Sequence, residues 1–324
     1  MKYVSNFASH IIGLIEQKRA LGYKYNDKPK MLKRFDLFCH EHYPNETALT
    51  QEIMMGWATK RPGEHPGTLQ VRLTPVRELA KYMVRQGLTA YIMPKGMSPR
   101  LPRYKPYIYS NDELKRIFNQ TDKCCCYYKT SLRHFVMPVF FRLLYCTGMR
   151  LSEARLLTVA DVDLNNGVIN VTNAKLDKHR QLPVSPEMLE RLTAYHQRVH
   201  MLSKPTDWFF PGFGDKPMTK GNVEKNLRKF LWQARISHGG RGKGPRVHDL
   251  RHTFAVHCLR RWVFENKSLN AYLPVLQAYL GHVSFSDTAY YLHLTAELFP
   301  DIVNKVEGAF GFIIPEGDNH YEAN

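Results

Sequence analysis

An apolar helical pattern that stops at a glycine near the middle of the chain constrains the fold most. Its members are Val136, Val139, Phe140, Leu143 and Leu144. Gly148 interrupts the pattern, and Arg150 and Glu153 follow it three residues apart, so on a new helix both lie on one face. Glu153 would then hold the Arg150 guanidinium at a helix start, where free N–H groups and the helix dipole favour a bound phosphate. A surface salt bridge is the alternative for this pair taken alone.

The charge of the chain points to a polyanionic partner. Among 324 residues there are 46 Lys and Arg but only 29 Asp and Glu, which gives a net charge of +17 and a pI near 9.6. Residues 1–105 carry +10 of this charge and the remainder +7. Nucleic acid is the expected ligand, because neutralising phosphates releases condensed counterions. At 44% hydrophobic residues the chain can bury a core, and its length suits two domains.

Cysteine spacing and hydropathy exclude several other classes. The six cysteines form no C-x-x-C pair, and three of them are adjacent at 124–126, so a disulfide framework and a tetrahedral metal site are both disfavoured. No run approaches the ~20 apolar residues of a membrane span, and the start of the chain lacks the apolar core of a signal peptide. A soluble, cytoplasmic, nucleoid-associated protein with reduced thiols, no cofactor and no membrane contact is expected.

Residues 1–94 are predicted to form a helical DNA-binding domain. Apolar residues recur there at helical spacing, and residues 61–67 (RPGEHPG) must be a loop. The helix expected over 68–86 contains Pro75, which should kink or restart it. Basic residues on its other faces are a solvated surface or contacts to DNA, and the excess charge favours DNA. The candidates are Arg72, Arg77 and Lys81.

Residues 95–107 are predicted to be a linker between the two domains. Prolines alternate with basic side chains there, and proline makes such a segment extended and semi-rigid. Arg103 is a candidate phosphate contact. The second domain is expected over 108–308, followed by a tail at 309–324 that begins with an apolar patch.

The second domain opens on a capping box, with Ser110 as N-cap and Glu113 three residues later. Three short strands are expected at 162–164, 168–171 and 181–184, the first two joined by a tight turn at Asn165-Asn166-Gly167. Helical patterns resume at 186–200 and 220–236, and residues 241–246 (RGKGPR) form a basic loop in which Arg241 and Lys243 are candidate DNA contacts. The fold class predicted is mainly α with a small antiparallel β-sheet.

Several polar residues stand at element starts or turn tips and together describe a phosphate site. They are Arg150, Lys175, His248, Arg251, His282 and one of two adjacent tyrosines. Such a cationic pocket would bind a phosphate whose charge grows in the transition state. The sequence shows no carboxylate cluster of the kind that a metal-dependent nuclease would need, so side-chain charge is expected to replace a metal. A tyrosine nucleophile would leave a phosphotyrosyl enzyme.

Four segments that contain these residues resemble, in the same order, the signature boxes of the tyrosine recombinase (phage integrase) family. They are residues 147–153 (TGMRLSE), 248–255 (HDLRHTFA), 280–282 (LGH) and 291–293 (YLH). Residues 175–183 (KLDKHRQLP), between the first two boxes, are similar to the family's β-hairpin lysine segment. The resemblance covers about 108–298 strongly, and 1–94 less strongly resembles the family's helical, SAM-like core-binding domain.

The resemblance implies a role for each residue. Arg150, supported by Glu153, and Arg251 would bind the non-bridging oxygens of the scissile phosphate. Tyr291 would attack, giving a 3′-phosphotyrosyl link and a free 5′-hydroxyl. Lys175 would act as general acid, His248 as base or hydrogen-bond partner, and His282 as a phosphate ligand, without metal or ATP. Tyr290 is the rival nucleophile, and spacing from the third box favours Tyr291. The remaining histidines of the boxes, His252 and His293, and His257 are interpreted as structural or supporting.

The implied activity is site-specific recombination or integration of double-stranded DNA in a mobile element, including transposition. A dimer on one site and a tetramer with a Holliday junction in synapsis are expected, with identical or paralogous subunits, and the tail could dock on a neighbour. Two alternatives remain, a type IB topoisomerase and a catalytically silent DNA-binding protein of the same fold.

Overall fold

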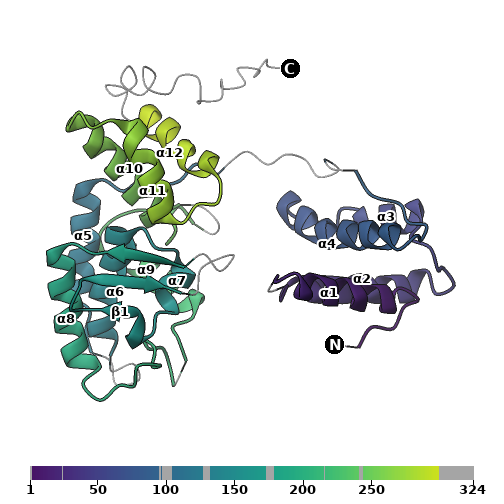
Figure 1. The fold of residues 1–324 in the computed structure, drawn as a ribbon, viewed down its shortest axis with the longest axis horizontal. Helices are drawn as coiled ribbons and strands as arrows, with labels where there is room; N and C mark the ends of the chain where they lie inside the picture. Colours follow the sequence, from purple (N-terminus) through teal and green to yellow (C-terminus); the bar gives the residue numbers. More distant parts are fainter. Residues whose placement is uncertain are drawn as a thin grey trace. The chain divides into compact units, whose positions relative to one another are not determined.

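A computed structural model describes residues 2–23, 25–94, 96, 104–126, 132–172, 179–214, 216–240 and 244–298. The chain divides into two compact units, residues 1–104 and 105–324, each of which is described here by itself (Figure 1). The division falls inside the segment predicted to be a linker. The described residues are mostly helical and include a small three-stranded antiparallel sheet, as the sequence predicts.

The described part of the first unit contains four helices: α1 (Ala8–Ala20), α2 (Lys28–His42), α3 (Gln51–Ala58) and α4 (Pro66–Arg85). Their apolar faces meet in one core that includes Leu14, Phe35 and Trp57. The loop prediction for 61–67 is two residues too long, because α4 begins at Pro66. Proline suits the first helical position, where its missing N–H is not needed, and His65 Nδ1 accepts from the Gly67 N–H. Pro75 lies inside α4 without dividing it.

The second unit carries the remaining elements. Its helices are α5 (Asn111–Asp122), α6 (Arg133–Thr147), α7 (Leu151–Arg155), the 3₁₀ turn η1 (Val159–Asp161), α8 (Pro186–Val199), α9 (Lys220–Gln233), α10 (Asp249–Phe264), α11 (Leu269–Leu280) and α12 (Phe285–Leu298). The capping box at the start of α5 is confirmed: the Ser110 hydroxyl accepts from the Glu113 N–H, and the Glu113 carboxylate accepts from the Ser110 N–H.

The sheet has the order β1 (Val162–Asp163), β2 (Val168–Val171) and β3 (Arg180–Pro183), all antiparallel. Val162 pairs with Ile169, and Ile169 pairs in turn with Leu182, so the register places these apolar residues on one face. The turn after β1 is held by Asp163 Oδ1, which accepts from the N–H groups of Asn165 and Asn166.

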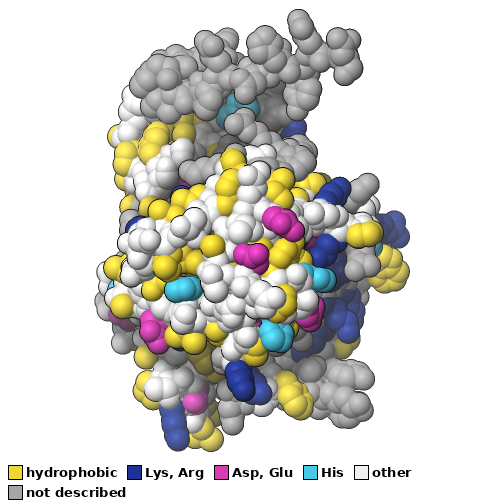
Figure 2. Space-filling model, turned by 90° about the vertical axis from the view of Figure 1, so that its right-hand side faces the viewer, with side chains coloured by type: hydrophobic (Ala, Val, Ile, Leu, Met, Phe, Trp, Pro, Cys, Tyr) yellow, Lys and Arg dark blue, Asp and Glu magenta, His cyan; other side chains and the backbone are white. Residues whose placement is uncertain are grey.

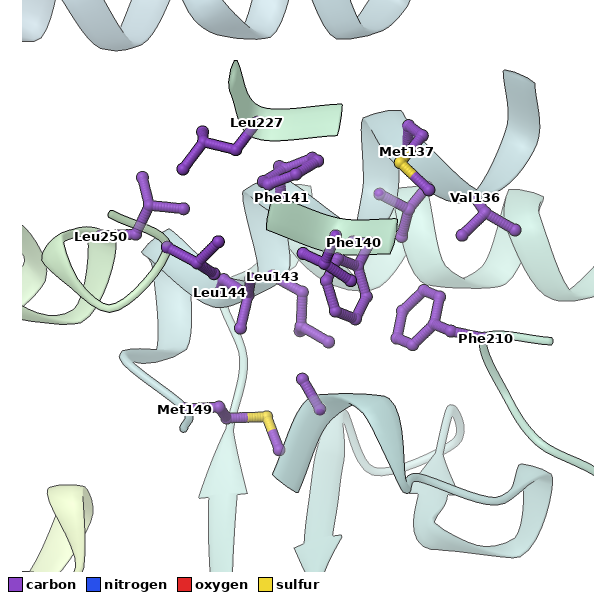
Figure 3. Close-up of a cluster of buried hydrophobic side chains, with 14 of the residues drawn as sticks. Val136, Met137, Phe140, Phe141, Leu143, Leu144, Met149, Phe210, Leu227 and Leu250 are labelled. Carbon is purple, nitrogen blue, oxygen red and sulfur yellow. The ribbon is translucent and has the colours of Figure 1, made fainter. Parts of the chain in front are cut away.

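Helix α6 lies at the centre of the larger core of this unit (Figure 3). Phe140 and Phe141 are fully buried and meet Phe210 and Phe230 edge to face. A separate apolar cluster joins α10, α11 and α12. These two cores fix the ends of α6, α10 and α11, at which the polar residues of the site are found.

The surface drawn in Figure 2 mixes hydrophobic and polar side chains, with Lys and Arg side chains gathered along one edge. Within the described residues, we find no helix whose length and apolar character would suffice to cross a membrane.

Candidate active site

Two helices meet at the glycine that interrupts the apolar pattern. Gly148 ends α6 in the left-handed conformation (φ 59°), and a Cβ at this position would stand 2.5 Å from Phe254 Cδ1. Both facts require glycine. Arg150 then caps α7, as predicted, but α7 has only five residues and Glu153 Oε2 accepts from the Arg150 N–H. The helix dipole therefore contributes little to anion binding, and the Arg150 guanidinium itself is the group that can bind an anion.

Glu153 joins two arginines, only one of which was predicted. Its Oε1 accepts from Arg150 Nη1 at 2.8 Å and from Arg180 Nη1 at 3.2 Å, and its Oε2 accepts from Arg180 Nη2 at 2.8 Å. The carboxylate side chain is 1% exposed. Burial alone would raise the pKa of Glu153, but the hydrogen bonds and charges of Arg180 and Arg150 hold that pKa below its usual value.

Arg251 lies between the ends of two helices. From the first turn of α10, its Nη1 donates to the Gly148 carbonyl at 2.8 Å and its Nη2 to the Leu280 carbonyl at 2.9 Å. The residue is 2% exposed, and burial lowers the pKa of Arg251 to about 10, so it stays charged at pH 7. The carbonyls at a helix C-terminus carry partial negative charge, which compensates the buried cation.

The end of α11 brings His282 and a second backbone acceptor to the same place. Gly281 caps this helix in the left-handed conformation (φ 68°), and its carbonyl accepts from Arg150 Nη2 at 2.9 Å. His282 Nδ1 hydrogen-bonds to the buried hydroxyl of Thr288 at 2.8 Å, which leaves Nε2 as the nitrogen that can face a ligand.

Tyr291 reaches the site from α12. Its ring stacks on that of His282, with centroids 5.9 Å apart, and its hydroxyl is 3.0 Å from His252 Nδ1. The residue is 2% exposed; burial raises the pKa of Tyr291, and the Arg251 charge opposes the rise. Tyr290 is adjacent and less deeply buried.

The histidines add less positive charge than the sequence suggested. Burial, followed by the charges of nearby arginines, lowers the pKa of His248 to about 4 and that of His282 to about 3. Burial also lowers the pKa of His252 to about 3, with the largest additional contribution from His248, whose ring centroid is 4.7 Å away. All three are neutral at pH 7 before DNA binds. The expectation that histidines contribute to a cationic pocket is corrected: in the described part of the site the arginines carry the charge.

Lys175, Arg103, Arg241 and Lys243 fall outside the described residues.

Of the three DNA candidates on α4, only Lys81 is exposed. Arg77 donates to the Met93 and Pro94 carbonyls from a half-buried position. Arg72 is 3% exposed; it is paired with Glu64 and donates to the backbone carbonyls of Trp57 and Thr59. The interpretation of Arg72 as a DNA contact is therefore corrected, because its guanidinium is enclosed by its own domain.

Two residues near the site were not predicted to act there. Arg180 stands in the lysine segment, but nothing local in the sequence indicates that it reaches Glu153. His252 was interpreted as supporting, and it is the residue that hydrogen-bonds to the Tyr291 hydroxyl. Its position one residue after Arg251, at the start of a helix, was the available signal.

Known proteins resemble the chain in sequence and in fold. Residues 108–297 match the model described as Phage integrase family. The integrase/recombinase y4rB of Sinorhizobium fredii is 30% identical over 310 residues, which cover 94% of this chain and 98% of the relative. Tyrosine recombinase XerA of Pyrococcus furiosus is 28% identical over 238 residues, 69% of this chain and 72% of the relative. A structure of the Tn1549 transposon integrase in complex with transposon right end DNA matches with a TM-score of 0.63 at 15% identity, over 93% of this chain and 99% of that one, and supports the fold alone.

Proposed function

The chain belongs to the tyrosine recombinase (phage integrase) family, and we propose that it is a site-specific DNA recombinase that cleaves and rejoins strands through a covalent link to Tyr291. One observation carries this proposal. Arg150 and Arg251 donate to neighbouring carbonyls at the end of α11, and the helix that follows brings Tyr291 against His282. Two guanidinium groups held at the end of one helix, with a tyrosine on the helix that follows, suit attack on a phosphodiester.

In the proposed cleavage step the Tyr291 oxygen attacks phosphorus. A bond from phosphorus to the tyrosine oxygen forms while the bond to the 5′ oxygen breaks, so the ester linkage is conserved and can be reversed by another 5′-hydroxyl. The hydroxyl proton passes to His252, whose neutral ring is already in contact with it. The 5′ oxygen takes a proton from a general acid, the role assigned to Lys175.

The arginines would hold the non-bridging oxygens in this step. A guanidinium offers paired donors in a fixed plane, which matches two phosphate oxygens. Arg150 is held by Glu153 and Arg251 by two backbone carbonyls, so neither needs to reorganise as charge develops on the phosphate. His282, through Nε2, and His248 complete the set of phosphate ligands.

Tyr291 cannot attack a phosphate while its side chain stays buried. A phosphate must enter or α12 must shift before reaction, and the contact with His252 is then in place to accept the hydroxyl proton. DNA binding would supply both the phosphate and the driving force. We assign this arrangement to the resting enzyme.

Recombination further implies assembly on DNA. We propose a dimer on each site and a tetramer in synapsis, formed by identical or paralogous subunits, in the integration or excision of a mobile element. The apolar segment at 309–314, which lies outside the described residues, would dock on a neighbouring subunit. Deletion of 309–324 should then abolish assembly on paired sites and leave single-site binding intact; normal recombination by the truncated protein would refute the docking.

Covalent trapping tests the proposed function directly. The full-length protein is expressed in cells, denatured, and the DNA attached to it is recovered and sequenced. An adduct with a defined sequence is expected for the wild type and for the matched control Tyr290→Phe, and none for Tyr291→Phe. Absence of a wild-type adduct, or an adduct that survives Tyr291→Phe, would refute the assignment. Relaxation of a supercoiled plasmid that lacks the trapped sequence would indicate topoisomerase activity instead.

A further inference from the structure

Arg180 is a buried cation near the proposed site to which the cleavage step assigns no role. It begins β3, and its side chain is 10% exposed. Both of its terminal nitrogens donate to Glu153, and its Nε donates to the Tyr279 carbonyl at 2.8 Å. The guanidinium therefore connects the β-sheet, the short helix α7 and the end of α11.

The end of α11 holds three arginines in a row. The consecutive carbonyls of Tyr279, Leu280 and Gly281 accept from Arg180, Arg251 and Arg150 respectively. Carbonyls in the last turn of a helix have no partner within the helix and form the negative end of its dipole. This one helix end thus fixes the spacing of the two proposed phosphate ligands and places Arg180 beside them.

Gly281 makes that arrangement possible. A Cβ on this residue would lie 3.0 Å from Arg180 Nη1 and 3.1 Å from Arg180 Cζ, closer than side chains normally approach. The left-handed backbone (φ 68°) also disfavours other residues. Glycine therefore allows the helix end to touch Arg180 as well as Arg150.

We propose that Arg180 is a positioning residue for DNA strand cleavage. Arg180 neutralises Glu153 and anchors β3 to α11, so that Glu153 can orient Arg150 without cancelling the positive charge that Arg150 presents to the phosphate. This inference rests on the proposed recombinase function.

The charges of the four side chains explain why a second arginine is needed. Arg150, Arg180 and Arg251 against Glu153 leave a net charge of +2. If Arg180 were neutral, the buried carboxylate would be balanced by Arg150 alone, and the potential at the phosphate would fall. Glu153 would also draw the Arg150 guanidinium toward the space that Arg180 now fills. Arg180 thus acts through Arg150 and need not touch DNA.

The primary test is Arg180→Gln in the full-length protein. Single-turnover cleavage is measured at saturating concentration of a nicked duplex built on the trapped sequence, alongside the dissociation constant for the intact duplex. Cleavage should slow by about 100-fold, the scale of a 1 Å misplacement of a reacting group, while DNA affinity changes by less than about threefold. Arg142→Gln is the matched control, because Arg142 on α6 makes a similar two-pronged pair with Asp122 on α5, and this variant should cleave as the wild type does.

A charge-compensation cycle separates positioning from structural support. If Arg180 acts by neutralising and holding Glu153, the double variant Arg180→Gln/Glu153→Gln should cleave at least as fast as Arg180→Gln alone, and the two effects should not multiply. Effects that multiply, with the double variant slower than either single variant, would overturn the proposal. Arg180→Lys, which keeps the positive charge but lacks the paired guanidinium donors, should cleave faster than Arg180→Gln and more slowly than the wild type.

The possible failures are distinguishable. A wild type that forms no covalent adduct overturns the recombinase function itself. A wild type that cleaves, together with an Arg180→Gln protein of unchanged rate or with a rate loss matched by lost DNA affinity, overturns only the positioning role. If Arg180→Gln does not fold, as judged by its melting transition, the cleavage rate of Arg180→Lys at full DNA occupancy is the test. A wild-type rate for that variant overturns the positioning role of the paired guanidinium donors.

Discussion

Replacing Arg150 by lysine tests whether the guanidinium geometry, rather than positive charge alone, holds the scissile phosphate. Arg150 uses Nη1 on Glu153 and Nη2 on the Gly281 carbonyl, and its side chain remains 24% exposed toward a ligand. Lysine has one compact ammonium group on a flexible stem. It can keep the ion pair with Glu153 or approach the phosphate, but it cannot do both in a fixed orientation.

The expected loss follows from the number of donors removed. Losing one preorganised donor to an oxygen that gains charge in the transition state costs about 3–4 kcal/mol, or roughly 100- to 1000-fold in rate. Affinity for DNA should change little, because the formal charge is kept and a recombination site offers many other phosphates. Cleavage should therefore fall while binding stays.

A suicide duplex measures the two quantities separately. Single-turnover formation of the covalent adduct gives the cleavage rate, and titration of the intact duplex gives the affinity. Arg150→Gln should be at least as slow as Arg150→Lys. Arg116→Lys, on α5, where the arginine pairs with Asp112, should match the wild type. An Arg150→Lys protein that cleaves within tenfold of the wild-type rate would refute the argument from geometry and return Arg150 to a surface salt bridge.

Three further predictions concern the pH dependence of stability, the helix break at Gly148 and two charged residues of α4. Native His248 has a pKa of about 4 against 6.5 when unfolded, so between these values the unfolded chain binds more protons, and acidification from pH 7 to 4 should lower the free energy of unfolding; urea titrations that gave equal stability at both values would contradict this. Gly148→Ala should destabilise the protein by about 2 kcal/mol or more, because position 148 has a positive φ and the added Cβ would contact Phe254. It should also slow cleavage, because the carbonyl that accepts from Arg251 would move. On α4, Arg72→Gln should lower thermal stability by on the order of 3 kcal/mol, whereas Lys81→Gln should leave stability unchanged and reduce the salt dependence of DNA binding by about one phosphate; the reverse pattern would restore Arg72 as a DNA contact.

Local signals in the sequence were enough for most elements of the fold. The capping box at Ser110 located the start of α5, because it depends on residues three apart. Gly148 located the break between α6 and α7, because only glycine fits a left-handed helix end in contact with another side chain. Strand positions were close to those observed for the same reason: apolar alternation and turn residues act over a few positions.

The corrections arise where a long-range contact decides. Arg180 reaches a carbonyl 99 residues away, and no spacing within the β-hairpin predicts that contact. The histidine pKa values depend on burial by segments distant in sequence, which residue type alone does not reveal. Arg72 is different: it follows Leu69 by three residues and precedes Val76 by four, so helical periodicity did place it on the buried face, and its basic character was given too much weight.

Two neighbouring arginines, one buried and one partly exposed, repel one another, and the way this site offsets the repulsion bears on its chemistry. Arg251 is compensated by carbonyls at the ends of α6 and α11, which are partial charges, and Arg150 by a carboxylate shared with Arg180. The described side chains therefore keep a net charge of +2 while the neighbouring histidines stay neutral. A phosphodiester in its ground state carries one negative charge, and the pentacoordinate transition state approaches two. In the proposed cleavage step, the residual charge of the arginines would thus complement the transition state better than the bound substrate, which is the condition for catalysis rather than tight binding.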